Sequence, residues 1–362
     1  MKFVHIADTH FDRPFINLSD KDILGDLRRM DQRKAFKKAI DYIKENNIEF
    51  LFISGDLYEQ QYIKQSTIEY INNLFKEIPN TRIFISPGNH DPYIKNSYYN
   101  KFNWSENVKI FSSKIEKVST DEANIYGYGF DDFYCRECGL ENFEINDKQK
   151  LNILIMHATL DGSKTVEKPY NPISKQLLQS KGFDYIALGH IHKLSYNDEP
   201  NQNIVYPGST VSLGFDELGE HGMIVGELNE EKKLKLEFLP LDEKEFKVTQ
   251  LDVSEIYSKE ELIEEINILE IPENIYLKVE LIGNRNFEID IYDIIKYLSN
   301  NQIIKIKDFT KLAYNLEKIQ NENTLRGLFA EKMNEKLKSE ELTEEQKNII
   351  EKAIEIGFEA LQ

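Results

Sequence analysis

The sequence has few of the features that mark secreted, membrane or disulfide-stabilised proteins. Only two of its 362 residues are cysteine, and apolar runs such as NILIM (152–156) are far shorter than a membrane span of roughly 20 residues. The amino terminus, MKFVHIADTH, places His5 and Asp8 where a secretory signal peptide needs unbroken apolar residues. We therefore expect a soluble, cytoplasmic protein that does not bind membranes.

The two cysteines, Cys135 and Cys138, have the spacing C-x-x-C. This spacing is found in redox-active pairs and in half-sites for zinc. The sequence has no second pair to complete four thiolates, and most of its histidines belong to the motifs described below. We therefore expect two loop thiols.

Basic residues are also in short supply, because 45 Lys and Arg stand against 63 Asp and Glu, for a formal charge of −18. Proteins that hold nucleic acid usually contact its phosphates with Lys and Arg, so this balance counts against tight, unaided DNA binding. It does not exclude a nuclease, because divalent cations can make a cleft locally positive. A partner could also supply a basic surface.

The pattern of apolar residues predicts a layered α/β domain. Five apolar runs that end in polar residues have the length of strands: FVHIAD (3–8), FLFISGD (50–56), RIFISPGNHD (82–91), LNILIMHAT (151–159) and YIALGHIH (185–192). Segments 35–47 and 68–78 have a helical period, and 204–210, 222–229 and 233–241 are predicted to be successive strands of a second sheet. The expected fold is a two-sheet sandwich flanked by helices.

A domain boundary is predicted near residue 242, where LPLDEKEF interrupts the strands with proline and charge. Residues 1–242 then form the main domain. Residues 243–315 alternate strands and helices as a small α/β capping domain, and residues 316–362 form a C-terminal helical segment. Its last helix opens with a capping box, in which Gln346 follows Thr343 by three residues.

Each of the five N-terminal strands ends in side chains that can bind a divalent metal ion. They are Asp8 and His10, Asp56, Asn89 with His90, His157, and His190 with His192. Such strand ends are expected to meet at one edge of the sheet, where ligands bind in open α/β folds. Imidazole, carboxylate and amide ligands together suit manganese, iron or zinc better than calcium.

The spacing within these motifs explains how one ion could be held by two side chains. In D-x-H and H-x-H, residues two apart on an extended segment point to the same side. Asp56 follows Gly55, which allows close approach, so its carboxylate could bridge two cations. Seven ligands then divide naturally between two divalent ions, for which we expect Mn²⁺.

Taken in order, ADTH, SGD, PGNHD, MHA and GHIH resemble the motifs of the calcineurin-like metallophosphoesterases. The resemblance implies that one metal is held by Asp8, His10, Asp56 and His192, and the other by Asp56, Asn89, His157 and His190. It also implies that His90 is the catalytic acid that protonates the leaving oxygen. Asp91 is expected to accept from the other ring nitrogen of His90 and orient it.

Two further segments, YPGSTVSLGFDELGEHG (206–222) and LRGLFAEKMNEKL (325–337), resemble the SbcD-type DNA repair exonucleases, and among them the YhaO-like branch. This resemblance implies a DNA substrate and a phosphoesterase domain followed by a capping domain. It also implies a partner, a coiled-coil SMC-like ATPase, onto which the C-terminal helices could dock. Whether two chains pair as a homodimer is left open.

Two other functions share the same motifs. A phosphoesterase for a small substrate such as a nucleotide would use the same metals, but could work with the first 240 or so residues alone. A catalytically inactive scaffold could keep the fold, but all seven ligands and His90 are present here.

Four groups of residues have two possible roles. His5 is expected to be a packed core residue rather than a support for a metal ligand, and His221 a surface-loop residue. Arg28, Arg29 and Arg33 could contact a substrate backbone, but such residues more often form a solvated helix face. The aromatic side chains of Tyr98, Tyr99, Phe102 and Trp104 could stack on bases or belong to the core.

Overall fold

A computed structural model describes residues 1–15, 24–137, 139–162, 167–312, 314, 316–339 and 342–361; Cys138 lies outside these ranges. The chain divides into two compact units. Unit 1 comprises Met1–Lys247 with Asn274–Tyr276, and unit 2 comprises Val248–Glu273 with Leu277–Gln362. The predicted division of residues 243–315 from 316–362 stays a prediction.

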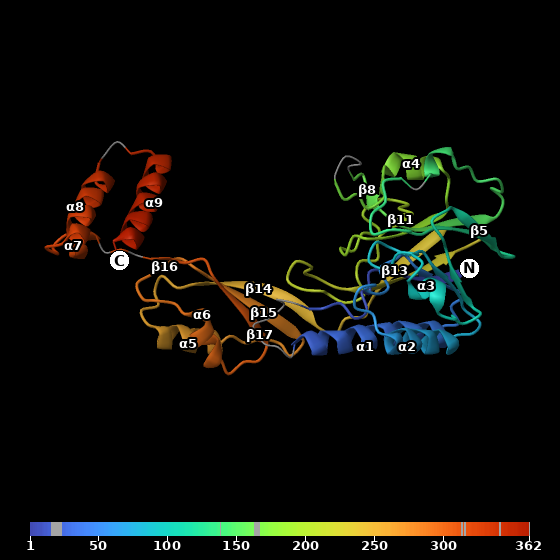
Figure 1. The fold of residues 1–362 in the computed structure, drawn as a ribbon, viewed down its shortest axis with the longest axis horizontal. Helices are drawn as coiled ribbons and strands as arrows, with labels where there is room; N and C mark the ends of the chain where they lie inside the picture. Colours follow the sequence, from blue (N-terminus) through green and yellow to red (C-terminus); the bar gives the residue numbers. More distant parts are fainter. Residues whose placement is uncertain are drawn as a thin grey trace. The chain divides into compact units, whose positions relative to one another are not determined.

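Unit 1 contains two large sheets (Figure 1). The first has the order β13-β12-β1-β2-β3-β4, with β1 (Lys2–Ile6), β2 (Phe50–Ile53), β3 (Arg82–Ile85), β4 (Val108–Ile110), β12 (Gly222–Leu228) and β13 (Leu234–Pro240). The second has the order β11-β10-β7-β6-β5, with β5 (Glu116–Ser119), β6 (Ala123–Tyr128), β7 (Leu151–His157), β10 (Tyr185–Gly189) and β11 (Ile204–Val205). The short strands β8 (Thr159–Leu160) and β9 (Pro172–Ile173) pair with each other.

Helices cover the outer faces of both sheets, as the sequence predicts. They are α1 (Leu24–Glu45), α2 (Gln65–Lys76), α3 (Tyr98–Lys101), the 3₁₀ helix η1 (Leu140–Asn142) and α4 (Lys175–Ser180). Val4 and Ile53 of the first sheet pack with Phe36 and Ile40 of α1. Figure 1 shows α1 and α2 beneath this sheet and α4 on the other side of unit 1, above the second sheet.

The inner faces of the two sheets pack against each other. Alternate residues of β1 and β2, among them Phe3 and Phe52, face Ile153 and Tyr185 of the second sheet. The ring centroids of Phe3 and Tyr185 lie 4.6 Å apart. Each such buried aromatic side chain stabilises the fold by roughly 1.5–3 kcal/mol. The predicted two-sheet sandwich with outer helices is therefore confirmed.

The assignment of the later strands differs from the prediction. Of the three runs expected to form one second sheet, only β11 joins the sheet of β10, in which the two strands are parallel. Strands β12 and β13 extend the first sheet, because β12 pairs antiparallel with β1. Strand β12 is buried over most of its length, so its two apolar faces carry no sequence signal for the sheet that it joins, and β13 follows it by antiparallel pairing.

Unit 2 combines a three-stranded sheet, the strand pair β16-β18 and helices. The strand order is β14-β15-β17. The elements are β14 (Glu245–Asp252), α5 (Lys259–Asn267), β15 (Ile275–Ile282), β16 (Asn284–Arg285), α6 (Ile291–Lys296), β17 (Ile303–Asp308), β18 (Lys311–Leu312), α7 (Leu316–Ile319), α8 (Leu325–Leu337) and α9 (Glu344–Ala360). The first residues of β14 (245–247) and of β15 (275–276) belong to unit 1. The capping box of Thr343 and Gln346 at the start of α9 is confirmed. Over the described residues, none of the helices combines the length and apolar character needed to cross a bilayer.

Arg28 lies neither in a substrate cleft nor on a solvated face, because its side chain is fully buried in unit 1. Its Nη2 donates to Asp242 Oδ2 at 2.7 Å and to the carbonyl oxygen of Ser212 at 2.7 Å, and its Nη1 donates to Asp31 at 3.0 Å. The guanidinium also lies 5.3 Å from the centroid of the Phe246 ring. Arg28 therefore ties α1 to the segment that follows β13.

Replacing Arg28 by alanine should strongly destabilise unit 1, because it leaves the buried carboxylate of Asp242 without its cation. We expect the free energy of unfolding to fall by about 3–5 kcal/mol. Trp104 is the only tryptophan and lies in unit 1, so its fluorescence during urea unfolding reports on this unit alone. Arg29→Ala is the matched control, because the Arg29 side chain is 35% exposed and its pair with Asp26 is worth little. Equal stability of the two variants would contradict the assignment.

Candidate metal centre

The five strand ends that carry the predicted ligands come from two sheets. Strands β1, β2 and β3 belong to the first sheet, and β7 and β10 to the second. The expectation that all five strand ends lie at one edge of a single sheet is therefore wrong. Their carboxyl ends still meet, because the backbone N of His190 in the second sheet donates to both carboxylate oxygens of Asp8, at 3.1 and 3.0 Å.

One group of predicted ligands gathers around Asp8. Its members Asp8, His10 and His192 each offer a ligand atom within 4.8 Å of the others. The Nε2 atoms of His10 and His192 are 3.2 Å apart, and His192 Nε2 lies 3.8 Å from Asp8 Oδ1. Two imidazoles at this separation, with a carboxylate beside them, could hold one divalent ion.

A second group gathers around Asp56 and His157. His157 Nε2 lies 3.3 Å from Asp56 Oδ2 and 3.0 Å from Asn89 Oδ1. Asp56 also lies close to the first group, because its Oδ2 is 3.7 Å from His10 Nε2. The Asp56 carboxylate thus stands between the two groups, where the sequence predicts a bridging ligand.

His190 lies beside the second group. The centroid of its ring is 5.2 Å from that of His157. Burial and the neighbouring charge of His157 lower the pKa of His190 to about 3. Its imidazole is therefore neutral at ordinary pH, the form that binds a metal ion.

The backbone at these positions is held in an uncommon conformation. Positive φ angles occur at Asp8 (51°), His10 (51°), Asp56 (51°) and His190 (103°), where side chains are normally disfavoured. Such residues cost on the order of 1–3 kcal/mol each, and they cluster where function requires them. The strand ends are therefore bent to bring their side chains together.

Gly55 allows one of these close approaches. Its φ is +87°, and a Cβ atom added there would lie 2.5 Å from Nδ1 of His157. Any other residue at this position would displace the His157 ring from Asp56. The glycine before Asp56 is thus required by the packing of the two sheets at the site.

The donor set fits a divalent cation. Asp8 and Asp56 are fully or almost fully buried, and their only ion-pair partners within the described ranges are histidines. Burial raises the pKa of Asp8. For Asp56 burial also acts to raise the pKa, but the charges and hydrogen bond of His157 and the charge of His10 lower it well below its usual value. Two buried carboxylates without Lys or Arg are the environment that a bound cation stabilises.

The histidine predicted as the catalytic acid has a different orienting partner from the one expected. His90 Nδ1 contacts Glu59 Oε2 at 2.8 Å, and Glu59 Oε1 contacts Nδ1 of His10 at 2.8 Å. Asp91 instead accepts from the backbone N of Asp56 at 3.0 Å and from the Tyr99 hydroxyl at 2.6 Å. The structure thus gives the orienting position to Glu59, while Asp91 fixes the loop beneath Asp56.

Glu59 is not predicted from the sequence, because this residue lies outside the motif SGD (54–56). Burial acts to raise its pKa, but the hydrogen bonds and charges of His10 and His90 outweigh this and lower it to about 2. The carboxylate is therefore charged. Its one signal in the sequence is its position in the loop, three residues after Asp56.

A second missed carboxylate, Glu217, supports the ligand His192. Its Oε1 lies 2.5 Å from Nδ1 of His192, and its Oε2 accepts from Ser209 Oγ at 3.2 Å and from the backbone N of Leu213 at 3.0 Å. His221, expected on a surface loop, is 4% exposed and contacts Ser209 Oγ at 2.9 Å. Through these contacts the segment 206–222 supports the predicted metal ligand His192.

The remaining candidates are structural. His5 is fully buried between Tyr185 and Ser54, at 2.9 Å from each side-chain oxygen, and burial lowers its pKa to about 3. It is the packed core residue that was expected.

Tyr99 is buried, and Tyr98, Phe102 and Trp104 pack against the same core, so this aromatic cluster is not a base-stacking surface. Cys135 lies in a loop, with its Sγ 3.2 Å from the hydroxyl of Tyr128.

Metal binding should release protons, because two ligands are protonated near pH 7 without a metal. Burial acts to lower the pKa of His157, but Asp56 raises it to about 9. Burial likewise acts to lower the pKa of His192, but Glu217 and Asp8 raise it to about 9. Affinity for Mn²⁺ should therefore rise between pH 7 and pH 8.5, by up to about tenfold per pH unit for each released proton. Calorimetry in buffers of different ionisation enthalpy counts these protons. A pH-independent affinity would contradict the expectation.

Glu217→Gln should weaken metal binding without removing a ligand. The amide keeps the shape of the side chain but loses the charge that orients and polarises His192. We expect the dissociation constant for Mn²⁺ to rise about 10- to 100-fold. Glu220→Gln is the matched control, because Glu220 lies in the same segment and is exposed. If both variants bind Mn²⁺ as tightly as the unchanged protein, the supporting role of Glu217 is wrong.

Comparison with known proteins gives these side chains a family. The metallophosphoesterase YhaO of Bacillus subtilis is 28% identical over 232 residues, which are 61% of this chain and 56% of YhaO. One of the subunits of the nuclease SbcCD from Staphylococcus epidermidis is 28% identical over 295 residues, 71% of this chain and 74% of that protein. The chain thus spans little more than half the length of YhaO.

Among solved structures, TT1561 of Thermus thermophilus aligns with 66% of this chain and 98% of its own, at 11% identity and a TM-score of 0.37. The sequence pattern of the calcineurin-like phosphoesterases matches residues 1–194, which include every strand end described above. Its match covers more than half of the chain, and the chain belongs to the calcineurin-like phosphoesterase family.

Proposed function

We propose that this protein is a metal-dependent nuclease that hydrolyses phosphodiester bonds of DNA, as an exonuclease in DNA repair. The observation that carries the proposal is the convergence of seven metal-binding side chains beside an oriented histidine. They are Asp8, His10, Asp56, Asn89, His157, His190 and His192, with His90 next to them. The loss of one ligand would be expected in an inactive scaffold, and none is lost.

The proposal includes two divalent ions, for which Mn²⁺ suits the mixed imidazole, carboxylate and amide donors. When bound, the ions lower the pKa of a water toward neutrality and neutralise charge on the phosphate. The chain's own contribution is to hold the donors in place. Asp56 stands between the two groups, and the contacts of Glu59 with His10 and of Glu217 with His192 fix the orientation of two rings.

His90 is proposed to protonate the leaving oxygen. Burial acts to lower its pKa, but the hydrogen bond with Glu59 and the charge of Asp56 raise it above the usual value. Both interactions therefore favour the protonated form of the ring. Glu59 occupies Nδ1, so Nε2 is the nitrogen that remains to donate a proton. The His90 side chain is 43% exposed, which leaves it accessible to substrate.

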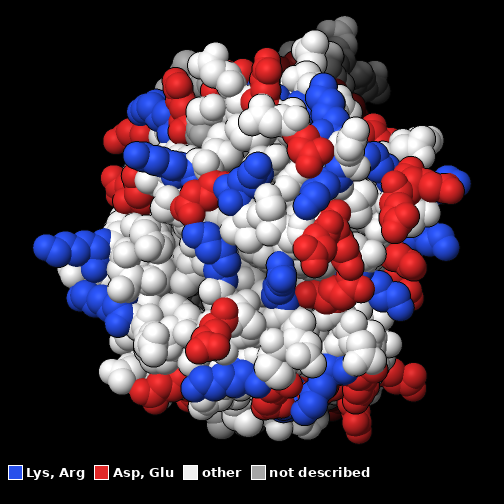
Figure 2. Space-filling view, turned by 90° about the vertical axis from the view of Figure 1, so that its right-hand side faces the viewer, with Lys and Arg blue, Asp and Glu red and all other residues white. Residues whose placement is uncertain are grey.

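A DNA substrate is favoured by the extent of the similarity to the nuclease subunit. That match runs over 295 residues, more than the whole of unit 1, whereas a small-substrate enzyme would need the metal domain alone. The surface charge favours a partner protein that helps to bind DNA. Figure 2 shows Lys and Arg side chains interspersed with Asp and Glu on the face toward the N terminus and β5, without a continuous basic band.

Because backbone affinity for DNA depends on basic surface, the proposal extends to a partner that supplies it. A coiled-coil SMC-like ATPase is the partner class that the resemblance to the SbcD-type exonucleases implies, and the similar nuclease is named as one subunit of a complex. Docking through the C-terminal helices belongs to the same proposal. Copurification of the two proteins, lost on deletion of residues 316–362, is the observation that this part needs.

His90→Asn should abolish DNA cleavage and leave metal binding intact. We expect a loss of about 10²- to 10⁴-fold in kcat on an oligonucleotide, whose leaving oxygen needs a proton. Hydrolysis of bis-p-nitrophenyl phosphate should fall much less, because p-nitrophenolate leaves without protonation. Calorimetric Mn²⁺ binding provides the control for the site itself.

Other results separate the alternatives. Cleavage of the small diester but not of single- or double-stranded oligonucleotides would favour a small substrate. No cleavage of either, with Mn²⁺ bound, would favour an inactive scaffold. Equal losses of His90→Asn on both substrates would remove His90 from proton transfer.

A further inference from the structure

The metal centre recognises a phosphate, which every nucleotide shares, so any contact with a base must come from other residues. The aromatic cluster near Trp104 is packed into the core and offers no such contact. A different set of rings leads away from the ligand His190. The centroid of the Tyr170 ring lies 4.9 Å from that of His190, and the centroid of the Tyr134 ring lies 5.8 Å from that of Tyr170. The three rings form a row that begins at the metal centre.

The outer end of this row is accessible. Tyr134 is 41% exposed, and Tyr170 is half-buried between Tyr134 and His190. The ammonium of Lys168 lies 5.5 Å from the centroid of the Tyr134 ring. Lys168 is itself exposed, so a flat ligand can displace its flexible side chain from the ring.

The two tyrosines are held by backbone hydrogen bonds next to the metal ligands. The backbone N of Cys135 donates to the carbonyl of Pro169 at 3.0 Å, and the N of Thr159 donates to the carbonyl of Tyr170 at 3.0 Å. The side chain of Asn171, which follows Tyr170, donates to the carbonyl of His157 at 3.1 Å. The row is therefore positioned before a substrate binds, which reduces the entropy lost on binding.

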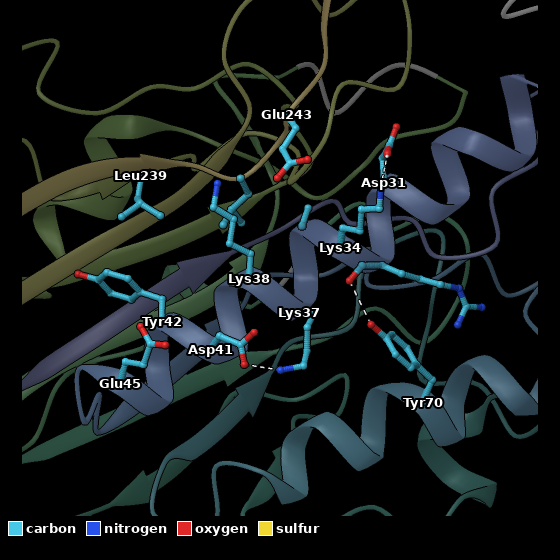
Figure 3. A pocket seen from close by; sticks show the side chains of 13 residues that line it. Asp31, Lys34, Lys37, Lys38, Asp41, Tyr42, Glu45, Tyr70, Leu239 and Glu243 are labelled. Carbon is cyan, nitrogen blue, oxygen red and sulfur yellow. Dashed lines mark hydrogen bonds and ion pairs between the residues drawn. The ribbon is translucent and has the colours of Figure 1, made fainter. Parts of the chain in front are cut away.

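A groove lined mainly by residues of α1 is the other candidate for binding DNA, but its charged side chains already have partners (Figure 3). It has a volume of about 690 Å³, and Arg33, Lys34, Lys37 and Lys38 line one side. Figure 3 shows Lys37 turned toward Asp41; Lys34 lies 3.8 Å from Asp31, Lys38 donates to the carbonyl of Pro240 at 3.2 Å, and Arg33 donates to Thr67 at 2.9 Å. A groove whose cations all have partners offers little to a phosphate backbone.

We propose that Tyr134, supported by Tyr170, is a stacking platform for the unpaired nucleobase that adjoins the scissile phosphate. The proposal rests on the proposed nuclease function and adds the residue that contacts the base. Stacking on an aromatic face accepts every base, so it gives affinity without sequence preference. Lys168, displaced from the ring by the base, then contacts a neighbouring phosphate.

The test compares two single-stranded oligonucleotides that differ by one base. One is intact, and the other carries an abasic residue beside the scissile phosphate, placed in turn at the 5′ and the 3′ side. The full-length protein with Mn²⁺ should cleave the intact strand with a kcat/KM about 5- to 100-fold higher. Tyr134→Ala should lower cleavage of the intact strand to the abasic level and leave the abasic strand unchanged, whereas Tyr134→Phe should behave as the unchanged protein.

Tyr292→Ala is the matched control, because Tyr292 in unit 2 is 72% exposed and also has a lysine ammonium 4.3 Å from its ring centroid. It should cleave both strands normally.

Equal effects of Tyr134→Ala on both strands, or no effect, would overturn the proposed stacking platform but leave the proposed nuclease function intact. If the unchanged protein cleaves bis-p-nitrophenyl phosphate but neither strand, the nuclease function itself fails. Base-dependent hydrolysis of the p-nitrophenyl ester of thymidine 5′-phosphate alone would assign the ring to a free nucleotide and overturn the DNA proposal.

Discussion

The burial of two carboxylates, Asp8 and Asp56, at the meeting point of two sheets is the constraint on which the rest of the site depends. Neither has a Lys or Arg partner within the described residues, and each lies among imidazoles instead. Burying a charge is costly unless it is paired or bound to a metal. The strained φ angles of the strand ends add to this cost. The two-layer core offsets both, and a bound cation would stabilise the arrangement further.

Two further carboxylates, Glu59 and Glu217, fix the orientation of histidine rings at the site. Glu59 contacts His10 and His90 with its two oxygens, so one side chain couples a metal ligand to the proposed proton donor. Glu217 holds His192 in the same way from the segment 206–222. A displacement of either carboxylate would turn a ring away from the position that the chemistry requires. The constraints on this site therefore extend to residues that touch neither metal nor substrate.

The parts of the structure that the sequence predicts are those with local causes. Strand ends, helical faces and the capping box follow from the spacing of neighbouring residues, and the seven predicted ligands lie close together because they stand at strand ends. The sheet to which β12 belongs, the partner of His90 and the burial of His221 depend on contacts between distant segments. The family resemblance predicts that Asp91 orients His90, but packing turns its carboxylate toward backbone N–H groups that would otherwise be unsatisfied.

The positions of the rings suggest why one metal centre could serve different substrates in this family. The ligands come from strand ends, where the packing of two sheets leaves little freedom. Tyr134 and Lys168 lie in loops beside the centre, and both side chains are exposed. A loop residue can thus alter what is bound next to the phosphate, while the chemistry at the phosphate stays the same. In the proposed function, the hydrolytic reaction and the choice of substrate therefore belong to separate parts of unit 1.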